Sequence, residues 1–290
     1  MPFACVIEAQ HLAMVLKGLE GLSNTVVITV KEEEGMFGHA QDDALVALCD
    51  WKISFDGFSH FEFFRTAKTC ISWKLDVRWL LKMIAGAEAG NHIEIYSNDN
   101  PTFLGLSYIE TSAGKRKTSE EFNAKLPLLK ITEDDRMKVS NVPSEYYDNQ
   151  VRMNSKTLLY MVNALQTQAA NVRISVDPQI FRCSIESRET GVSTHLSIPQ
   201  KNDTMTNKEH WVDLSGMRRS FEQRFPLKFL QTFTSCANQV GRVDLFFRQN
   251  HPIIVRYFLG ESQKNGYLSF FTSPLLQNDG TRDEDVAPGL

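Results

Sequence analysis

Four short segments of the sequence alternate apolar residues with other residues, and each follows a stretch with helical spacing. Period-two alternation is typical of a strand with one buried face, whereas apolar residues at i, i+3 and i+4 are typical of a helix with one buried stripe. The combined pattern recurs at intervals of about 70 residues, which indicates a fourfold internal repeat. The predicted strands are Val26–Val30, Ile93–Ile95, Val172–Val176 and Val243–Phe247.

A helix is predicted before each of these strands. The apolar stripes of the four helices lie within Leu12–Leu19, Val77–Ile84, Leu158–Leu165 and Leu227–Ala237. Asp76 stands where an N-cap side chain accepts a backbone hydrogen bond, and the third helix is expected to begin at Ser155. Each helix is therefore expected to lay one face on a sheet.

Further alternating segments fill the gaps between the repeats. They are Leu45–Ile53, Phe103–Ile109, Gln179–Ile185, His195–Ile198, Phe221–Phe225 and Ile253–Phe258. A few helices among many antiparallel strands predict an α+β fold, with the helices on one face of the sheets.

The four repeats group as two plus two, which predicts two similar domains at residues 1–130 and 149–276. Residues 131–148 are charged and lack a clear periodicity, so we interpret them as an interdomain connecting loop. Residues 277–290 are polar and acidic, and we expect them to form a disordered tail.

Composition limits the classes of protein that the chain can represent. Its 290 residues include 31 Lys and Arg and 35 Asp and Glu, a formal net charge of −4, so the protein is not polybasic overall. No apolar run approaches the roughly 20 residues of a membrane span, and Met1–Cys5 does not resemble the start of a signal peptide. Five cysteines without a C-x-x-C pair favour reduced thiols over disulfides or a zinc site.

Cations gather on the helix faces opposite the apolar stripes, although the chain is acidic. These faces carry Lys17, Arg78, Lys82, Lys156 and Lys228. Only Glu20 and the cap Asp76 oppose them there, since the other acids concentrate in segments such as Glu32–Glu34 and in the tail. On one helix such a bias would describe an ordinary solvated surface. On four repeated helices it predicts a shared surface for a polyanion.

Catalytic motifs are absent from the sequence. It contains no Walker A motif, no G-x-G-x-x-G and no G-x-S-x-G. Asp42 and Asp43 lie near His39 and could be an acid/base or metal cluster, but a solvated turn is the simpler interpretation. We therefore expect no enzyme, no cofactor and no metal site. The alternative from another class is a nuclease that uses Asp42 and Asp43, which would need convergent carboxylates.

Several segments, taken in order, resemble the proliferating cell nuclear antigen family of sliding clamps. Gln41–Leu48 resembles the family's M-D-x-S-H-V-x-L segment, and Gly57-Phe58 with Phe61 resembles its G-F-x-x-Y. Leu75–Gly86 resembles the family's second inner helix, and Val142–Tyr146 resembles the end of its connecting loop. Phe225–Leu230 resembles its T-F-x-L-R-Y-L motif, and Pro252–Pro274 resembles its closing strands with their A-P motif. The resemblance covers nearly the whole chain.

The sequence also departs from this family pattern. The family's M-D-x-S-H is Gln41-Asp-Asp-Ala-Leu45 here, and its final K-I is Leu275-Leu276. Ala113–Lys117 and Lys201–Glu209 have the character of insertions. The resemblance is therefore to a divergent member, as from a protist or a large DNA virus.

The resemblance implies a DNA-clamp fold and a head-to-tail homotrimeric ring around double-stranded DNA. The four helices of each chain would line the hole, where the five cations named above would contact phosphates without reading the base sequence. Strands near Glu120–Leu129 and Val192–Ile198 would join the subunits. The implied function is that of a processivity factor for DNA replication and repair, in the nucleus or at a viral replication site.

A pocket for partner peptides is also implied by the resemblance. DNA polymerase, ligase, nuclease and clamp-loader motifs would dock under the connecting loop, with no membrane involved. The matching positions are Gln41, Leu45, Val46, Ser140, Val142, Pro252, Phe271, Thr272 and Pro274. Two related alternatives stay open, namely a subunit of a checkpoint-type heterotrimeric clamp and a viral processivity factor that forms no ring.

Overall fold

The computed structural model describes most of the chain. The described residues are 3–63, 70–85, 91–97, 102–112, 115–133, 135, 147–165, 169–186, 193–201, 210–260 and 263–275, with the backbone alone for 110–112 and 115–123. The predicted tail at 277–290, the pocket positions Ser140 and Val142, and Val192 of a predicted subunit contact lie outside them.

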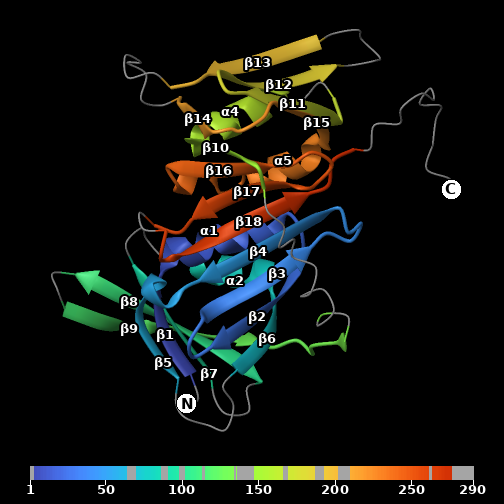
Figure 1. The fold of residues 1–290 in the computed structure, drawn as a ribbon. Coiled ribbons are helices and arrows are strands. Elements are labelled where there is room, and N and C mark those ends of the chain that lie inside the picture. Colours follow the sequence, from blue (N-terminus) through green and yellow to red (C-terminus); the bar gives the residue numbers. More distant parts are fainter. Residues whose placement is uncertain are drawn as a thin grey trace.

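The structure contains all four predicted helix–strand repeats and adds a strand before each helix, so that the repeated unit is strand–helix–strand (Figure 1). The first unit is β1 (Phe3–Glu8), α1 (Ala9–Glu20) and β2 (Thr25–Lys31), and the second is β6 (Cys70–Asp76), α2 (Val77–Ile84) and β7 (His92–Ser97). The third is β10 (Asn149–Asn154), α4 (Ser155–Leu165) and β11 (Asn171–Asp177), and the fourth is β15 (Phe221–Pro226), α5 (Leu227–Phe233) and β16 (Arg242–Phe247).

The two helix starts that the sequence predicted are confirmed. The Asp76 carboxylate accepts a 3.0 Å hydrogen bond from the Trp79 amide, which satisfies one of the free N–H groups at the start of α2. Helix α4 begins at Ser155, where the Asn154 side chain accepts a 2.9 Å hydrogen bond from the Lys156 amide. The Ser155 hydroxyl instead donates to the Ala237 carbonyl at 2.8 Å, because it is buried against the segment that follows α5.

Two predicted boundaries are wrong. The fourth helix ends at Phe233, and Ala237 lies in a separate 3₁₀ turn, Ala237–Gln239. Thr234 ends the helix early, because its hydroxyl donates to the Gln231 carbonyl and its amide is shared between Leu230 and Gln231. The strand expected from Leu45 begins only at Ala47, since Leu45 has a left-handed φ of 58° in a turn.

Each pair of repeats is interlocked by its strand pairing. β1 pairs with β7 and β2 with β6, and in the same way β10 pairs with β16 and β11 with β15. The first strand of one unit therefore always pairs with the second strand of the other, and every pairing is antiparallel. This arrangement brings α1 against α2 and α4 against α5.

The remaining strands extend the four-strand frameworks into three antiparallel sheets. They are β3 (Gly35–Gln41), β4 (Ala47–Ile53), β5 (Phe58–Phe63), β8 (Phe103–Ser112), β9 (Lys115–Pro127), β12 (Ile180–Glu186), β13 (Ser193–Pro199), β14 (Val212–Gly216), β17 (Ile253–Phe258) and β18 (Gly266–Thr272). The strand orders are β5-β1-β7-β8-β9, β13-β12-β11-β15 and β14-β10-β16-β17-β18-β4-β3-β2-β6. The predicted α+β class, with few helices among antiparallel strands, is confirmed.

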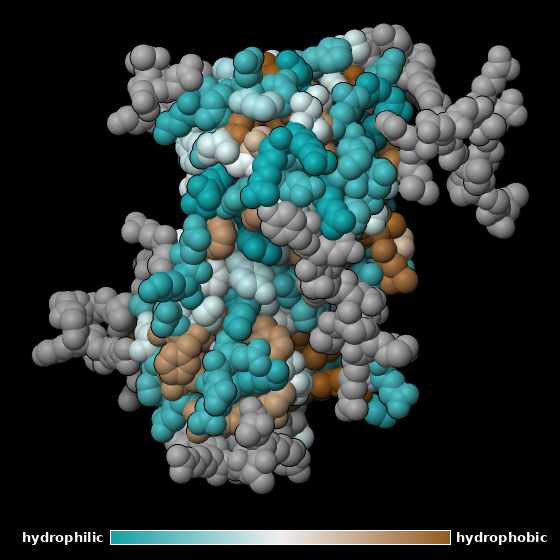
Figure 2. All heavy atoms as spheres, viewed as in Figure 1, coloured by the Kyte–Doolittle hydropathy of each residue, from teal (hydrophilic) through white to brown (hydrophobic). Residues whose placement is uncertain are grey.

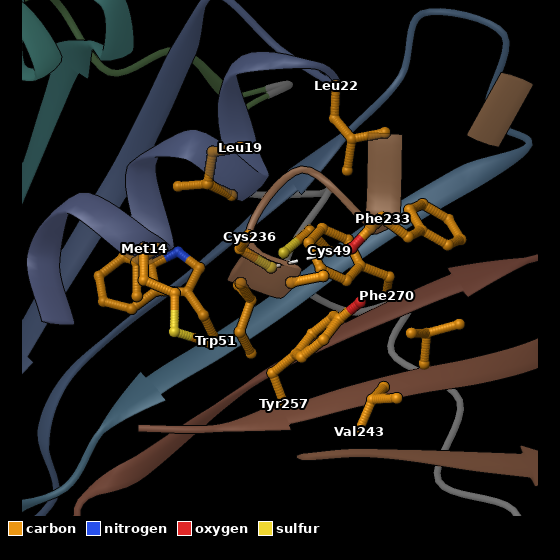
Figure 3. Close-up of a cluster of buried hydrophobic side chains, with 14 of the residues drawn as sticks. Met14, Leu19, Leu22, Cys49, Trp51, Phe233, Cys236, Val243, Tyr257 and Phe270 are labelled. Carbon is orange, nitrogen blue, oxygen red and sulfur yellow. Dashed lines mark hydrogen bonds between the residues drawn. The ribbon is translucent and has the colours of Figure 1, made fainter. Parts of the chain in front are cut away.

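The nine-stranded sheet joins the two pairs of repeats, because β18 pairs with β4. Buried side chains from both pairs meet beneath this junction (Figure 3). Phe233, the last residue of α5 in the fourth repeat, stacks on Phe270 of β18 with ring centroids 4.8 Å apart, and Met14 of α1 lies in the same cluster. The division into domains at 1–130 and 149–276 stays a prediction. No helix in the described part of the chain has the length and apolar character that crossing a membrane requires.

Candidate functional site

The five predicted cations all stand exposed on the helices. Lys17 lies in the last turn of α1, Arg78 and Lys82 on α2, Lys156 in the first turn of α4, and Lys228 near the start of α5. The opposite side of each helix is buried, as the fully buried Leu12 and Leu16 of α1 illustrate. The amphipathic spacing therefore fixes which side of each helix meets solvent.

The four helices form one continuous surface, which we call the helix face. Helices α1 and α2 pack together, as do α4 and α5. The end of α1 lies beside the end of α5. There the Ser235 hydroxyl donates a 3.3 Å hydrogen bond to the Lys17 carbonyl. A Cβ added to Gly21 would lie 2.4 Å from Thr232, so the two helix pairs approach closely. The cations of both pairs thus belong to one surface.

The charge on the helix face is not neutralised within the described residues. The described acids pair with cations elsewhere, for example Glu34 with Lys31, Glu222 with Arg173 and Asp177 with Arg182, and none of them pairs with the five cations. Lys82 and Lys228 instead lie over the rings of Trp79 and Phe229, at 5.6 and 4.5 Å from the centroids. Free ammonium and guanidinium groups of this kind attract phosphates.

A second feature lies on the other face of the nine-stranded sheet, which we call the outer face. On the helix side, Gly18 of α1 lies against Phe270, so the alternation of side chains directs Phe271 to the outer face. Phe271 stands opposite both Leu48 and Ile254, and Ile254 stands opposite Phe246. These four apolar side chains form a row across four strands, separate from the main core, and Tyr147 packs against it.

The turn between β3 and β4 projects beside this apolar row. The Asp42 carboxylate accepts hydrogen bonds from the amides of Ala44, Val46 and Ala47, at 3.2, 2.8 and 2.6 Å. The turn holds Leu45 in solvent, with 65% of its surface exposed. In Figure 2 hydrophobic atoms gather at the right-hand edge, where Figure 1 places this turn. Asp42 therefore has a structural role as a turn cap.

The structure brings most of the described pocket positions together at one end of the apolar row. Gln41 stands opposite Leu48, Val46 accepts a 3.3 Å hydrogen bond from the amide of Ser273, and Pro274 follows directly. The Pro252 carbonyl accepts a 2.8 Å hydrogen bond from the Tyr147 hydroxyl.

Thr272 differs from the other predicted pocket positions. It is fully buried and stands opposite Ala47 and Ile253, so its side chain lies on the helix side of the sheet. The geometry therefore does not bring the Thr272 side chain to the outer face.

Sequence reasoning missed Leu48, Ile254, Phe246 and Tyr147 as members of this site. A signal was present, because Ile253-Ile254-Val255 and Phe270-Phe271 place adjacent apolar residues on a strand. Neighbouring residues of a strand face opposite sides, so one of each pair had to lie away from the helices. The alternation alone did not reveal that these residues would line up across strands.

A polar row runs beside the apolar row on the same face. Its members, in the order of their strands, are Asp244, Arg256, Ser269, Asp50 and His39. Asp50 Oδ1 lies 2.9 Å from His39 Nδ1, and Asp50 Oδ2 accepts a 2.9 Å hydrogen bond from the Tyr267 hydroxyl. Burial and the adjacent Asp50 carboxylate raise the pKa of Tyr267. This polar network fixes β18 against β4 beside the apolar row.

The described residues at the two ends of the predicted connecting loop contact the nine-stranded sheet or the residue next to it. Lys74 of β6 lies 2.9 Å from Asp135, and Tyr147 contacts Pro252 as above. Burial alone would raise the pKa of Asp135, but hydrogen bonds from Lys74 and Thr132 outweigh it and lower the pKa to about 2. Gln41, Leu48 and Asp135 also line a shallow hollow over β2 and β3.

Two further observations concern the alternatives. Within the described residues, no three His, Cys, Asp or Glu side chains gather as a metal site. Both oxygens of the Asp42 carboxylate, which the nuclease alternative would use, accept backbone hydrogen bonds within the turn. Strands β9 and β13, which include most of the two predicted subunit contacts, each lie at an edge of their sheet.

Comparisons with known proteins give a consistent but distant relationship. No protein-family model matches the chain. A curated relative, proliferating cell nuclear antigen 2 of Drosophila melanogaster, is 21% identical over 246 residues, which cover 85% of this chain and 87% of the relative. The chain is thus similar to a proliferating cell nuclear antigen along most of its length, and its mixed, largely antiparallel fold is compatible with a clamp.

Proposed function

We propose that the protein is a divergent sliding clamp of the proliferating cell nuclear antigen type, which encircles duplex DNA and tethers replication and repair enzymes to it. Three copies form a closed ring, and the protein has no catalytic activity of its own. The observation that carries the proposal is the helix face. It presents five exposed cations without acidic partners among the described residues, in a chain of net charge −4.

The separation of cations on the helices from acids on other surfaces supports topological rather than sequence-specific binding of DNA. Cations on α1, α2, α4 and α5 contact phosphates, which all sequences share, so the duplex is held without being read. The acids of other surfaces discourage DNA from binding outside the ring. The similarity to a proliferating cell nuclear antigen over 85% of the chain supports the same function.

Ring closure is supported by the edges of two sheets. β9 ends the five-stranded sheet and β13 ends the four-stranded sheet. A head-to-tail contact between β9 of one chain and β13 of the next uses two different surfaces, and such contacts close into a ring when the rotation fits. Pro127 in β9 lacks an amide proton, so the pairing omits a donor at that residue.

The apolar row and the Leu45 turn form the proposed docking site for partner peptides. Polymerase, ligase, nuclease and clamp-loader motifs with aliphatic and aromatic side chains insert beside Leu45, Val46, Pro252, Phe271 and Pro274. Ser140 and Val142 of the connecting loop complete this site in the proposal. A role in replication and repair places the protein in the nucleus or at a viral replication site.

Oligomeric state and DNA retention test the proposal together. Light scattering after size exclusion should give a mass near three times the 33.0 kDa chain. After loading, the protein should remain on closed circular DNA and leave it once the circle is cut, because only an encircling ring is held by topology. A monomer at micromolar concentration would favour the checkpoint-type or non-ring alternatives.

A charge variant tests the helix face separately. Combined Arg78→Ala, Lys82→Ala and Lys228→Ala should leave the mass of the assembly unchanged and shorten retention on circular DNA, most clearly at low salt. The matched control replaces Lys130, Lys201 and Arg219, which are exposed cations outside the four helices. Equal retention of the helix variant and the control would refute the assignment of this surface to DNA.

A further inference from the structure

Two large aromatic side chains stand exposed on the helix face among its cations. Trp79 of α2 and Tyr160 of α4 each have 59% of their surface exposed. Trp79 lies beside Arg78 in sequence and has Lys82 one turn away, and Tyr160 has Lys156 one turn away. Amphipathic packing does not account for them, because the apolar stripes of both helices lie on the buried side.

Two contacts restrain Trp79 although its ring is exposed. Its amide donates to Asp76 at the cap of α2, which fixes the backbone there. The Lys82 ammonium lies 5.6 Å from the centroid of the indole ring, within the range of a cation–π interaction. An exposed ring that is restrained in this way and flanked by cations loses less conformational entropy than an unrestrained one when it receives a planar group.

Duplex DNA offers no partner for such a ring. Its bases are stacked on one another, and its surface presents phosphates and groove edges. Unpaired bases, in contrast, expose π-faces that stack on aromatic side chains without sequence preference, while neighbouring cations follow the backbone. The combination of Trp79 with Arg78 and Lys82 fits single-stranded nucleic acid better than a duplex.

We propose that the helix face also binds single-stranded DNA, with Trp79 as a stacking platform and Tyr160 as a second one. This inference rests on the proposed function, because it gives the same DNA-facing surface a second form of DNA. In the proposed ring the two aromatic residues lie on helices that flank each subunit boundary, since α2 contacts β9 and α4 contacts β12, the neighbour of β13. The ring would then engage unpaired bases at primer ends or gaps while it encloses the duplex.

The tryptophan distribution provides a direct signal. Trp51 and Trp73 are buried and Trp211 is half-buried, so Trp79 is the most exposed tryptophan. Oligothymidylate of about 20 nucleotides at low salt should quench part of the tryptophan emission through base stacking. The quenched part should be absent in Trp79→Leu and retained in Trp211→Phe, because only the first variant lacks the exposed ring.

Affinity measurements decide the proposal. By anisotropy of labelled oligothymidylate, Trp79→Leu should bind about tenfold more weakly than the parent, and Trp79→Phe should recover much of the loss because it restores a ring. Phe55→Leu is the matched control, since Phe55 is 53% exposed but lies in the 3₁₀ turn Phe55–Gly57, outside the four α-helices, and it should bind as the parent does. Duplex retention on circular DNA should be unchanged in all three variants.

Each outcome separates this inference from the proposed function. Unchanged oligothymidylate binding in Trp79→Leu overturns the stacking platform while leaving the duplex clamp intact. An equal loss for single strands and duplex also overturns the stacking platform, because stacking on unpaired bases would weaken single-strand binding alone. Emission from Trp79 that becomes shielded on trimer formation, without any response to oligothymidylate, would assign the ring to a protein interface and also overturn the inference. If the proposed function is wrong, the parent protein itself will not be retained on circular DNA.

Discussion

The Ser235 hydroxyl donates a 3.3 Å hydrogen bond to the backbone carbonyl of Lys17, across 218 residues of sequence. It links the end of α1 to the segment that follows α5. Together with the close approach of Gly21 to Thr232, it makes the two helix pairs neighbours. Cations that the sequence places on separate repeats are thereby presented on one surface.

Leu45→Asn tests the docking site without disturbing the turn. Asn tolerates the left-handed φ of 58° that this position requires, while it removes the exposed apolar contact. An anchor residue typically contributes about 2 kcal/mol, so a peptide with a glutamine and two aromatic residues should bind about thirtyfold more weakly by calorimetry. Phe55→Asn replaces another exposed apolar side chain, away from the docking site and the predicted subunit contacts, and is the control. Equal affinities of the two variants would contradict the docking site.

Gly18→Ala should destabilise the protein although alanine favours a helix by about 1 kcal/mol. The added Cβ would lie 2.7 Å from Phe270, and that ring cannot retreat because it is fully buried and stacked on Phe233. Overpacking of this kind costs about 1–3 kcal/mol in the free energy of unfolding, measured by urea denaturation.

Gly241→Ala is the control for Gly18→Ala, since nothing lies within 4 Å of its added Cβ. We expect no loss of stability there, and a gain of about 0.4–1 kcal/mol from a less flexible unfolded chain. A loss in Gly241→Ala as large as that in Gly18→Ala would show that the packing explanation is wrong.

The Asp135–Lys74 pair predicts a defined pH dependence. The pKa of Asp135 is lowered to about 2 in the folded protein, so its carboxylate stabilises the fold at pH values above the ordinary Asp pKa of about 3.9. That contribution is lost progressively as the pH falls from about 4 towards about 2. The difference in unfolding free energy between the parent and Asp135→Asn should therefore shrink between about pH 5 and pH 3. A difference that stays constant over this range would argue against the pair.

Thiol reactivity checks the burial of the cysteines. All five are free, and only Cys70 is exposed. Burial raises the pKa of Cys183 and of Cys236 to about 12, so these thiols are protonated and unreactive at neutral pH. A thiol reagent should modify one cysteine rapidly in the native protein and five after denaturation. Mass spectrometry should locate the fast site at Cys70.

Local sequence patterns predicted the individual helices and strands better than the way in which they assemble. The alternation at Val26–Val30 and the cap at Asp76 are properties of adjacent residues, and both are found in the structure. The early end of α5 depends on side-chain hydrogen bonds of Thr234, which compete with the helix in a way that apolar spacing does not show.

The candidate site was accessible to sequence reasoning only in part. The solvent-facing positions of Lys17 and Lys228 follow from helical periodicity, so their exposure could be predicted. The apolar row depends instead on the register of β4, β18 and β17, which brings Leu48 opposite Phe271 from distant parts of the chain. Register is set by tertiary pairing, and a single sequence gives little information about it.

The pairing of β18 with β4 has a consequence for synthesis of the protein on the ribosome. Tyr267 and its partner Asp50 are 217 residues apart, so β4 lacks its second neighbour until β18 has been translated. An unpaired strand edge is a template for pairing with other chains, and long-range pairing is slow to form. Nascent chains therefore have a long interval in which that edge is open, and a folding helper that covers β4 would raise the yield of native protein.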